Sequence, residues 1–170
     1  EPAAGSEFYF NGMTVEILAP IREYSDLNDN SIVLKITDGD VNFLFTGDIE
    51  TESEYDIIQS AENLSADVLK VAHHGSDTSS SEEFIKKVSP EYAVISVGKD
   101  NSYGHPKEST LDLFNRLNIK TYRTDQSGTI TFKTDGEKID ITNENNNSDT
   151  NIVQNKEEQV NYKKDVKSYL

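Results

Sequence analysis

The sequence has no cysteine, few basic residues and no long apolar stretch. Without cysteine, disulfides and thiolate metal ligands are excluded, and cysteine usage gives no reading of the redox compartment. No apolar run approaches the roughly 18 to 20 residues that span a bilayer. The chain starts at Glu1-Pro2, without an initiator methionine or a signal peptide. We therefore expect a processed chain or a piece of a longer one.

Acidic residues outnumber basic ones, 31 to 16, which gives a formal net charge of −15. Residues 1–136 contain 24 acidic and 11 basic side chains, so the acidity belongs to the part that we expect to fold. Nucleic-acid-binding proteins usually carry a basic stripe, and none is visible. Any phosphate chemistry would therefore need metal ions to supply positive charge.

The periodicity of apolar residues predicts hairpins first and alternating strands and helices afterwards. Strand pairs are expected over residues 8–18, around Asn11-Gly12, and over 31–46, around Asp38-Gly39-Asp40. Three helices are expected: one over residues 50–61, a short one that starts after Ser80 and ends before Pro90, and one that contains Leu111 and ends at Asn118. The other expected strands are 68–72, 92–97, 119–123, 129–133 and 138–141. The fold class is therefore α/β, with a mixed sheet and flanking helices.

The composition changes after Thr142, where asparagine, aspartate, glutamate and lysine dominate. Such a segment cannot bury enough apolar surface to offset the entropy lost on ordering. We expect one domain over residues 1–142 and a disordered polar linker or tail over 143–170.

Four polar residues stand at the ends of predicted strands or in restrained loops: Asp48, His73, His74 and His105. Carboxylate and neutral imidazole are good ligands for zinc and similar divalent ions. Each residue also has a simpler interpretation: Asp48 as a turn or helix-capping residue, and the histidines as surface or solvated loop residues. The chain has only three histidines, and their concentration at strand ends favours a functional site.

Five segments occur in an order that resembles one known family. That family is the metallo-β-lactamase-fold domain of ComEC-type competence proteins, which are membrane proteins of bacterial DNA uptake. Related secreted metallohydrolases, including phosphorylcholine esterases, are also similar. The resemblance covers about residues 5–135, and its segments are 28–34, 44–48, 67–76, 101–106 and 122–128.

The resemblance implies an αββα sandwich with two divalent metal ions, zinc or manganese. It places Asp48 as the bridging ligand, His74 as a second ligand and His73 beside the substrate phosphate. The main metal-binding motif of that fold, His-x-His-x-Asp-His, is absent from this chain. We therefore expect the C-terminal half of the sandwich, which alone would be inactive and whose partner is the missing N-terminal half of the same domain.

The leading hypothesis is a metal-dependent hydrolase of phosphodiester-type bonds with His73 and His105 as catalytic residues. Single-stranded DNA is one candidate substrate, and no nucleotide cofactor is expected. The alternative is a non-catalytic binding or scaffold module that kept the sheet without a complete metal site. The resemblance also implies that the domain is secreted or lies at the outer face of the cell membrane. The longer protein to which it belongs would then be embedded in the membrane.

Overall fold

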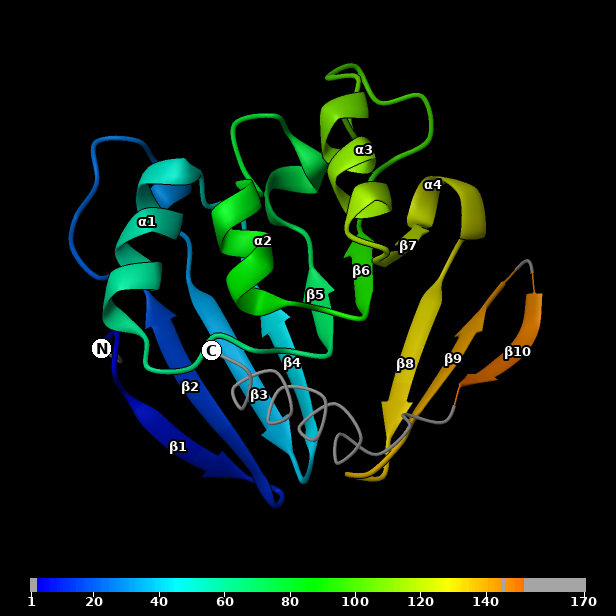
Figure 1. The fold of residues 1–170 in the computed structure, drawn as a ribbon, viewed down its shortest axis with the longest axis horizontal. Helices are drawn as coiled ribbons and strands as arrows, with labels where there is room; N and C mark the ends of the chain where they lie inside the picture. The colour runs from blue at the N-terminus through cyan, green and yellow to red at the C-terminus, as the bar shows by residue number, and fades with distance from the viewer. Residues whose placement is uncertain (1–2, 145, 152–170) are drawn as a thin grey trace, which may run out of the picture.

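The computed structural model describes residues 3–144 and 146–151, and it has two sheets and one layer of helices (Figure 1). The larger sheet has seven strands in the order β1-β2-β3-β4-β5-β6-β7. These strands are Glu7–Phe10, Met13–Ala19, Val33–Asp38, Val41–Phe45, Val68–Lys70, Tyr92–Ile95 and Lys120–Arg123. The smaller sheet has the order β10-β9-β8, formed by Asn146–Asn151, Ile139–Asn143 and Ile130–Thr134.

The pairing changes from antiparallel to parallel in the middle of the large sheet. The strands β1 to β4 form an antiparallel meander, whereas β4, β5, β6 and β7 run parallel. Parallel neighbours need crossover connections, and these contain α1 (Thr51–Ser60), α2 (Glu82–Val88) and α3 (Glu108–Arg116). The predicted α/β class with a mixed sheet and flanking helices is confirmed.

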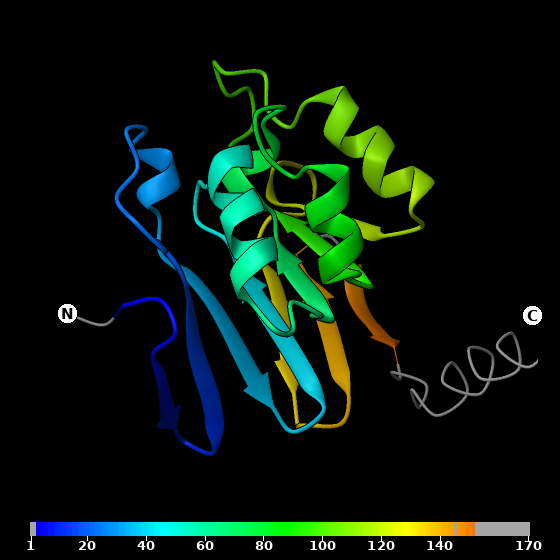
Figure 2. The same ribbon diagram turned by 60° about the vertical axis from the view of Figure 1, so that its left-hand side comes forward.

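The helices cover one face of the large sheet, and the small sheet lies on the other side (Figure 2). Ile57, Phe84 and Phe114 from α1, α2 and α3 pack into a core with Leu44, Leu69 and Ile95 from the strands. A second apolar cluster lies between the two sheets, where Val68 and Tyr92 meet Ile139 and Ile141 of β9. The large sheet thus buries side chains on both faces, under the helices on one side and under the small sheet on the other, because successive side chains of a strand point to opposite faces.

The structure also contains elements that the sequence pattern did not predict. Two short 3-10 segments, η1 (Asn28–Asn30) and η2 (Ala72–Gly75), precede β3 and follow β5, and α4 (Thr124–Ser127) follows β7. Strand β5 ends at Lys70, so both neighbouring histidines lie in η2. Residues 146–151, which lie inside the polar tail predicted from residue 143 onward, form the strand β10. The rest of that predicted tail, 152–170, lies outside the described residues.

One part of the large sheet carries aromatic side chains on its surface. The register places Phe8 opposite Val15, Val15 opposite Ile36, and Ile36 opposite Phe43, so these residues share one face. Phe43 packs against the cluster between the sheets. This is the side away from the helices, and its outer part includes Phe8, Phe10 and Phe45, which are 46%, 59% and 41% exposed.

Candidate functional site

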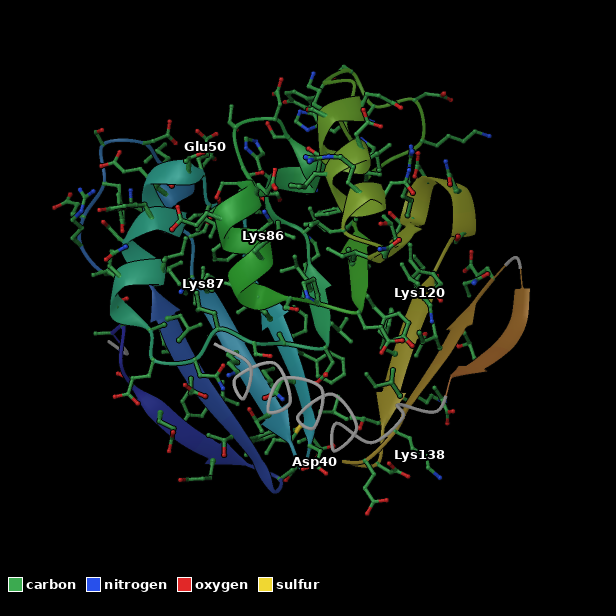
Figure 3. All side chains as sticks on the ribbon, in the orientation of Figure 1. Asp40, Glu50, Lys86, Lys87, Lys120 and Lys138 are labelled. Atoms are coloured by element: carbon green, nitrogen blue, oxygen red, sulfur yellow. The ribbon has the colours of Figure 1, made fainter. Side chains whose placement is uncertain are left out.

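The carboxyl ends of the parallel strands bring together the four site residues that the sequence predicts. Asp48 follows β4, His73 and His74 follow β5, and His105 lies in the long loop after β6. Loops at this edge of a parallel sheet commonly hold the reacting groups of α/β proteins. Glu50 is labelled near this end of the molecule in Figure 3, and Asp40, in the β3–β4 turn, is at the opposite end.

The histidine pair is held in an unusual backbone conformation. His73 and His74 have φ of 45° and 55°, in the left-handed region that residues with a side chain seldom adopt. The turn is fixed by hydrogen bonds from the His73 N–H to the Gly47 carbonyl, 3.2 Å, and from the Ser76 N–H to the His73 carbonyl, 2.9 Å. Such strain costs about 1 to 3 kcal/mol per residue and is concentrated at functional sites.

His74 and Asp48 bring an imidazole nitrogen and a carboxylate oxygen close to each other. His74 Nδ1 lies 2.6 Å from the Ser96 carbonyl oxygen and must donate to it, because a carbonyl only accepts. The lone pair is therefore on Nε2, which lies 3.7 Å from Asp48 Oδ1. Both side chains remain partly exposed. A histidine whose second nitrogen donates to a carbonyl is the usual form of a metal-binding imidazole.

His73 contacts Glu50, a residue that sequence analysis did not select. Its Nδ1 lies 3.2 Å from Glu50 Oε1, without the geometry of a hydrogen bond. The same Oε1 accepts hydrogen bonds from Thr78 Oγ1, 2.9 Å, and Asn28 Nδ2, 3.3 Å. The Glu50 carboxylate thus lies against one side of the His73 ring, and no local sequence signal distinguishes it from an ordinary glutamate at a helix start.

The backbone of Glu50 is itself fixed by a buried carboxylate. Asp29 is 3% exposed, and its Oδ1 accepts hydrogen bonds from the N–H groups of Glu50, 2.8 Å, and Ser53, 3.2 Å. These groups belong to the start of α1, where a carboxylate satisfies amides that have no partner within the helix. Asp29 therefore anchors the segment that carries Glu50.

His105 stacks on His73, with ring centroids 5.7 Å apart. Its Nδ1 is buried and, within the described part of the chain, has no hydrogen-bond partner. Burial lowers the pKa of His105 below its usual value, and the positive charge of Lys107 lowers this pKa further. His105 is therefore held in its neutral form more strongly than a solvated loop histidine.

Asn101 fixes the loop that carries His105. Its side-chain amide donates to the carbonyls of Gly98, 3.1 Å, and His105, 2.7 Å, and its Oδ1 accepts from the His105 N–H, 3.0 Å. Gly75 abuts the other side of this loop: a Cβ at Gly75 would lie 2.6 Å from Pro106 Cβ. The histidine turn and the His105 loop therefore pack directly against each other.

All four predicted residues face one open cavity of about 590 Å³ at the sheet edge. The cavity is large enough for a small ligand or one end of a polymer. The remaining lining residues carry no functional signal of their own in the sequence, although three of them lie in the segments that carry the family resemblance. These remaining residues are Ser96, Val97, Gly98, Asn101, Tyr103 and Thr124.

The donors present fit part of a divalent metal site. Asp48 supplies a carboxylate oxygen and His74 an oriented imidazole nitrogen, which are the donor types that zinc and manganese accept. Within residues 3–144 and 146–151, no group of three or more histidine, cysteine, aspartate or glutamate side chains is arranged to hold a metal. A complete coordination shell would therefore need further ligands from outside the described residues or from water.

Comparison with known proteins relates the chain to bacterial competence proteins. It is 39% identical over 134 residues to ComE operon protein 3 of Bacillus subtilis, and 40% identical over 131 residues to competence protein ComA of Neisseria gonorrhoeae. It is 33% identical over 128 residues to recombination protein 2 of Haemophilus influenzae. These alignments cover 78%, 76% and 75% of this chain.

The same alignments cover only 17%, 19% and 16% of the three relatives, so the chain spans less than a fifth of their length. No protein-family model matches the chain. Among the described residues, no helix is both long enough and apolar enough to cross a membrane. The three relatives nevertheless agree with one another and with the resemblance carried by the five sequence segments. The chain is therefore homologous to one segment of the ComEC-type competence proteins.

Proposed function

We propose that this chain is part of a metal-dependent hydrolase that cleaves phosphodiester-type bonds, with DNA handled in competence as its substrate. The observation that carries the proposal is the Asp48–His74 pair, in which an oriented Nε2 and a carboxylate oxygen face each other at the edge of the cavity. Competence proteins are named for the uptake of DNA, which makes a phosphodiester the natural substrate class.

In this proposal, Asp48 and His74 hold divalent metal ions, zinc or manganese. Such ions, when bound, lower the pKa of water to generate a nucleophile and screen the charge of the phosphate. His73, whose ring is positioned by Glu50, lies beside the phosphate. His105 lines the same cavity and donates a proton to the leaving oxygen or a hydrogen bond to a phosphoryl oxygen.

The remaining ligands would come from the N-terminal half of the same domain. Two features support this part of the proposal: the described donors make only part of a metal site, and the outer aromatic side chains of the large sheet are exposed. Strand β8 is also an edge strand of the small sheet, and in Figure 1 it lies nearer the middle of the molecule than β9 and β10. Added strands beside β8 would cover the exposed aromatic residues. The full protein would act at the outer face of the cell membrane.

The test is hydrolysis by the full-length protein of which this chain is a segment. Purified protein loaded with zinc or manganese should cleave single-stranded oligonucleotides, and the Asp48→Ala variant should not. Far-UV circular dichroism of both proteins serves as the folding control. A full-length protein that binds metal but cleaves neither DNA nor a simple phosphodiester would contradict the proposal.

A second candidate function is a binding or scaffold module without catalysis. The observation that favours it is the incomplete donor set of the described residues. It predicts that the full-length protein also binds no divalent metal at Asp48 and His74. Measuring metal content therefore separates the two candidates.

A further inference from the structure

Tyr103 is the one strongly exposed large aromatic side chain among the lining residues of the cavity. It is 77% exposed and lines the same cavity as Asp48 and the three histidines. Burying an aromatic ring is favourable, so an exposed ring at the mouth of a cavity is a candidate contact for a ligand. Its place and exposure need an explanation that the proposed hydrolysis alone does not give.

The ring of Tyr103 is held on a fixed loop rather than on a mobile tip. Lys107 Nζ donates a hydrogen bond to the Tyr103 carbonyl, 3.0 Å, and Asn101 ties the loop together on either side of it. The ring also meets His105 edge to face, with centroids 5.9 Å apart. A ring that is already ordered loses little conformational entropy when a ligand stacks on it.

Four rings form a path from the candidate metal ligands to the mouth of the cavity. The centroids of His74 and His73 are 6.4 Å apart, those of His73 and His105 are 5.7 Å apart, and Tyr103 follows at 5.9 Å. A phosphate contacted by His105 would leave its neighbouring nucleoside beside Tyr103, whose ring centroid lies 5.9 Å from that of His105. Lys107, whose Nζ donates to the Tyr103 carbonyl, places one positive charge at this end.

We propose that Tyr103 stacks an unpaired nucleobase next to the phosphate held in the cavity, so that the site selects single-stranded over duplex DNA. The inference rests on the proposed function, because it assumes a phosphodiester in the same cavity. Aromatic side chains bind single strands by stacking, with little dependence on sequence, whereas the bases of a duplex are already stacked on each other. A single residue thereby gives strand selectivity without the broad basic surface that this acidic chain lacks.

The experiment uses tryptophan as a reporter, because the chain contains none. The Tyr103→Trp variant is titrated with an oligothymidylate whose phosphorothioate linkages resist hydrolysis, and tryptophan fluorescence is followed. Tyr9→Trp is the matched control, because Tyr9 is also 77% exposed but lies on β1, outside the cavity. Parallel titrations use an abasic oligomer of equal length, the duplex and phosphocholine. Fluorescence anisotropy of a labelled oligomer gives the affinities of the Tyr103→Ala and Tyr103→Phe variants.

We expect the oligothymidylate to quench the Tyr103→Trp variant and leave the Tyr9→Trp control unchanged, with weak responses to the abasic oligomer and the duplex. Tyr103→Ala should weaken single-strand binding by about 5- to 100-fold, as stacking on one residue implies, and Tyr103→Phe should preserve it. Equal binding of the abasic oligomer, equal affinity of Tyr103→Ala, or no binding of the oligothymidylate would overturn the inference. Quenching by phosphocholine alone would also overturn it, because the ring would then bind a quaternary ammonium group.

These measurements do not depend on turnover. Stacking without hydrolysis by the full-length protein would leave the inference standing and remove the proposed function. Hydrolysis without stacking would leave the proposed function standing and remove the inference about Tyr103.

Discussion

At the scale of single residues, His105 is the side chain whose role is most sharply testable. It stacks on His73 and lines the cavity, but it takes no part in the contact between Asp48 Oδ1 and His74 Nε2. His105→Ala in the full-length protein should therefore leave metal content intact and reduce kcat by about 10²-fold or more, as the loss of a general acid does. The loss should shrink for an activated aryl phosphodiester, whose leaving group needs no proton. Equal losses on both substrates would leave only phosphate positioning.

The pH dependence of that effect has a definite sign. Burial and Lys107 lower the pKa of His105 below its usual value of about 6.5. The protonated form that an acid requires is therefore scarce at neutral pH and increases as the pH falls. The ratio of wild-type to His105→Ala turnover on an unactivated substrate should rise from pH 8 to pH 6, and a flat ratio would contradict the acid role.

Glu50 should matter for stability as well as for His73. Its Oε1 accepts hydrogen bonds from Thr78 Oγ1 and Asn28 Nδ2 and contacts His73 Nδ1, so Glu50→Ala removes both hydrogen bonds and this contact. We expect a loss of about 0.5 to 1.5 kcal/mol in the free energy of unfolding, measured with urea, because the hydrogen bonds that are lost are exposed or partly buried. Glu50→Gln retains an acceptor oxygen and should lose less. Equal losses for the two variants would show that side-chain bulk, not hydrogen bonding, is responsible.

At the scale of elements, the site depends on how closely η2 approaches the His105 loop. Gly75 has φ of +83°, and a Cβ there would lie 2.6 Å from Pro106 Cβ. Gly75→Ala therefore combines backbone strain with a clash between two functional segments. Hydrogen exchange of the backbone amides in residues 98–107 should be faster in this variant. Gly12→Ala is the control, because Gly12 also has positive φ, +87°, but nothing lies within 4 Å of its added Cβ. Equal exchange in the two variants would show that the contact does not position the loop.

Much at this scale could be predicted from the sequence. Alternating apolar and polar residues predicted the two hairpins, because a strand buried on one face is apolar at every second position. Short β-branched runs predicted β5 and β6, because a strand buried on both faces is apolar throughout. Asp48, His73, His74 and His105 could be selected because all three histidines of the chain gather, with an aspartate, at predicted strand ends or in restrained loops. Glu50 and Asp29 could not, because a glutamate at a helix start and an aspartate in a polar loop look like ordinary surface residues. Their roles arise from contacts across 21 to 24 positions of sequence, which local patterns do not encode.

Strand β10 escaped prediction for a related reason. Its composition is polar throughout, and it is formed by backbone pairing with β9 rather than by an apolar pattern. The strands β8 and β9 were predicted, but their pairing into a second sheet was not, since no sequence pattern specifies which of two sheets a strand joins. The structure resolves this by placing the apolar side chains of β9 against Val68 and Tyr92 of the large sheet.

At the scale of the whole molecule, the half-domain proposal makes a prediction about association. Phe8 and Phe10 are 46% and 59% exposed on β1, and contiguous exposed apolar surface favours association. The isolated chain should self-associate in sedimentation velocity, and the double variant Phe8→Ser/Phe10→Ser should associate less. Tyr55→Ser is the control, because Tyr55 is 58% exposed but belongs to α1 in the helical layer. A monomeric chain with a cooperative unfolding transition would contradict the half-domain proposal.

The proposed metal site is tested by the metal content of the full-length protein and of three alanine variants, determined by elemental analysis after purification and reloading with zinc or manganese. Asp48→Ala and His74→Ala should each lose metal, because each removes a direct ligand, whereas His73→Ala should keep most of the metal and lose turnover. Full metal content in both Asp48→Ala and His74→Ala would contradict the account. Loss of metal in His73→Ala but not in His74→Ala would reverse the assignment within the histidine pair.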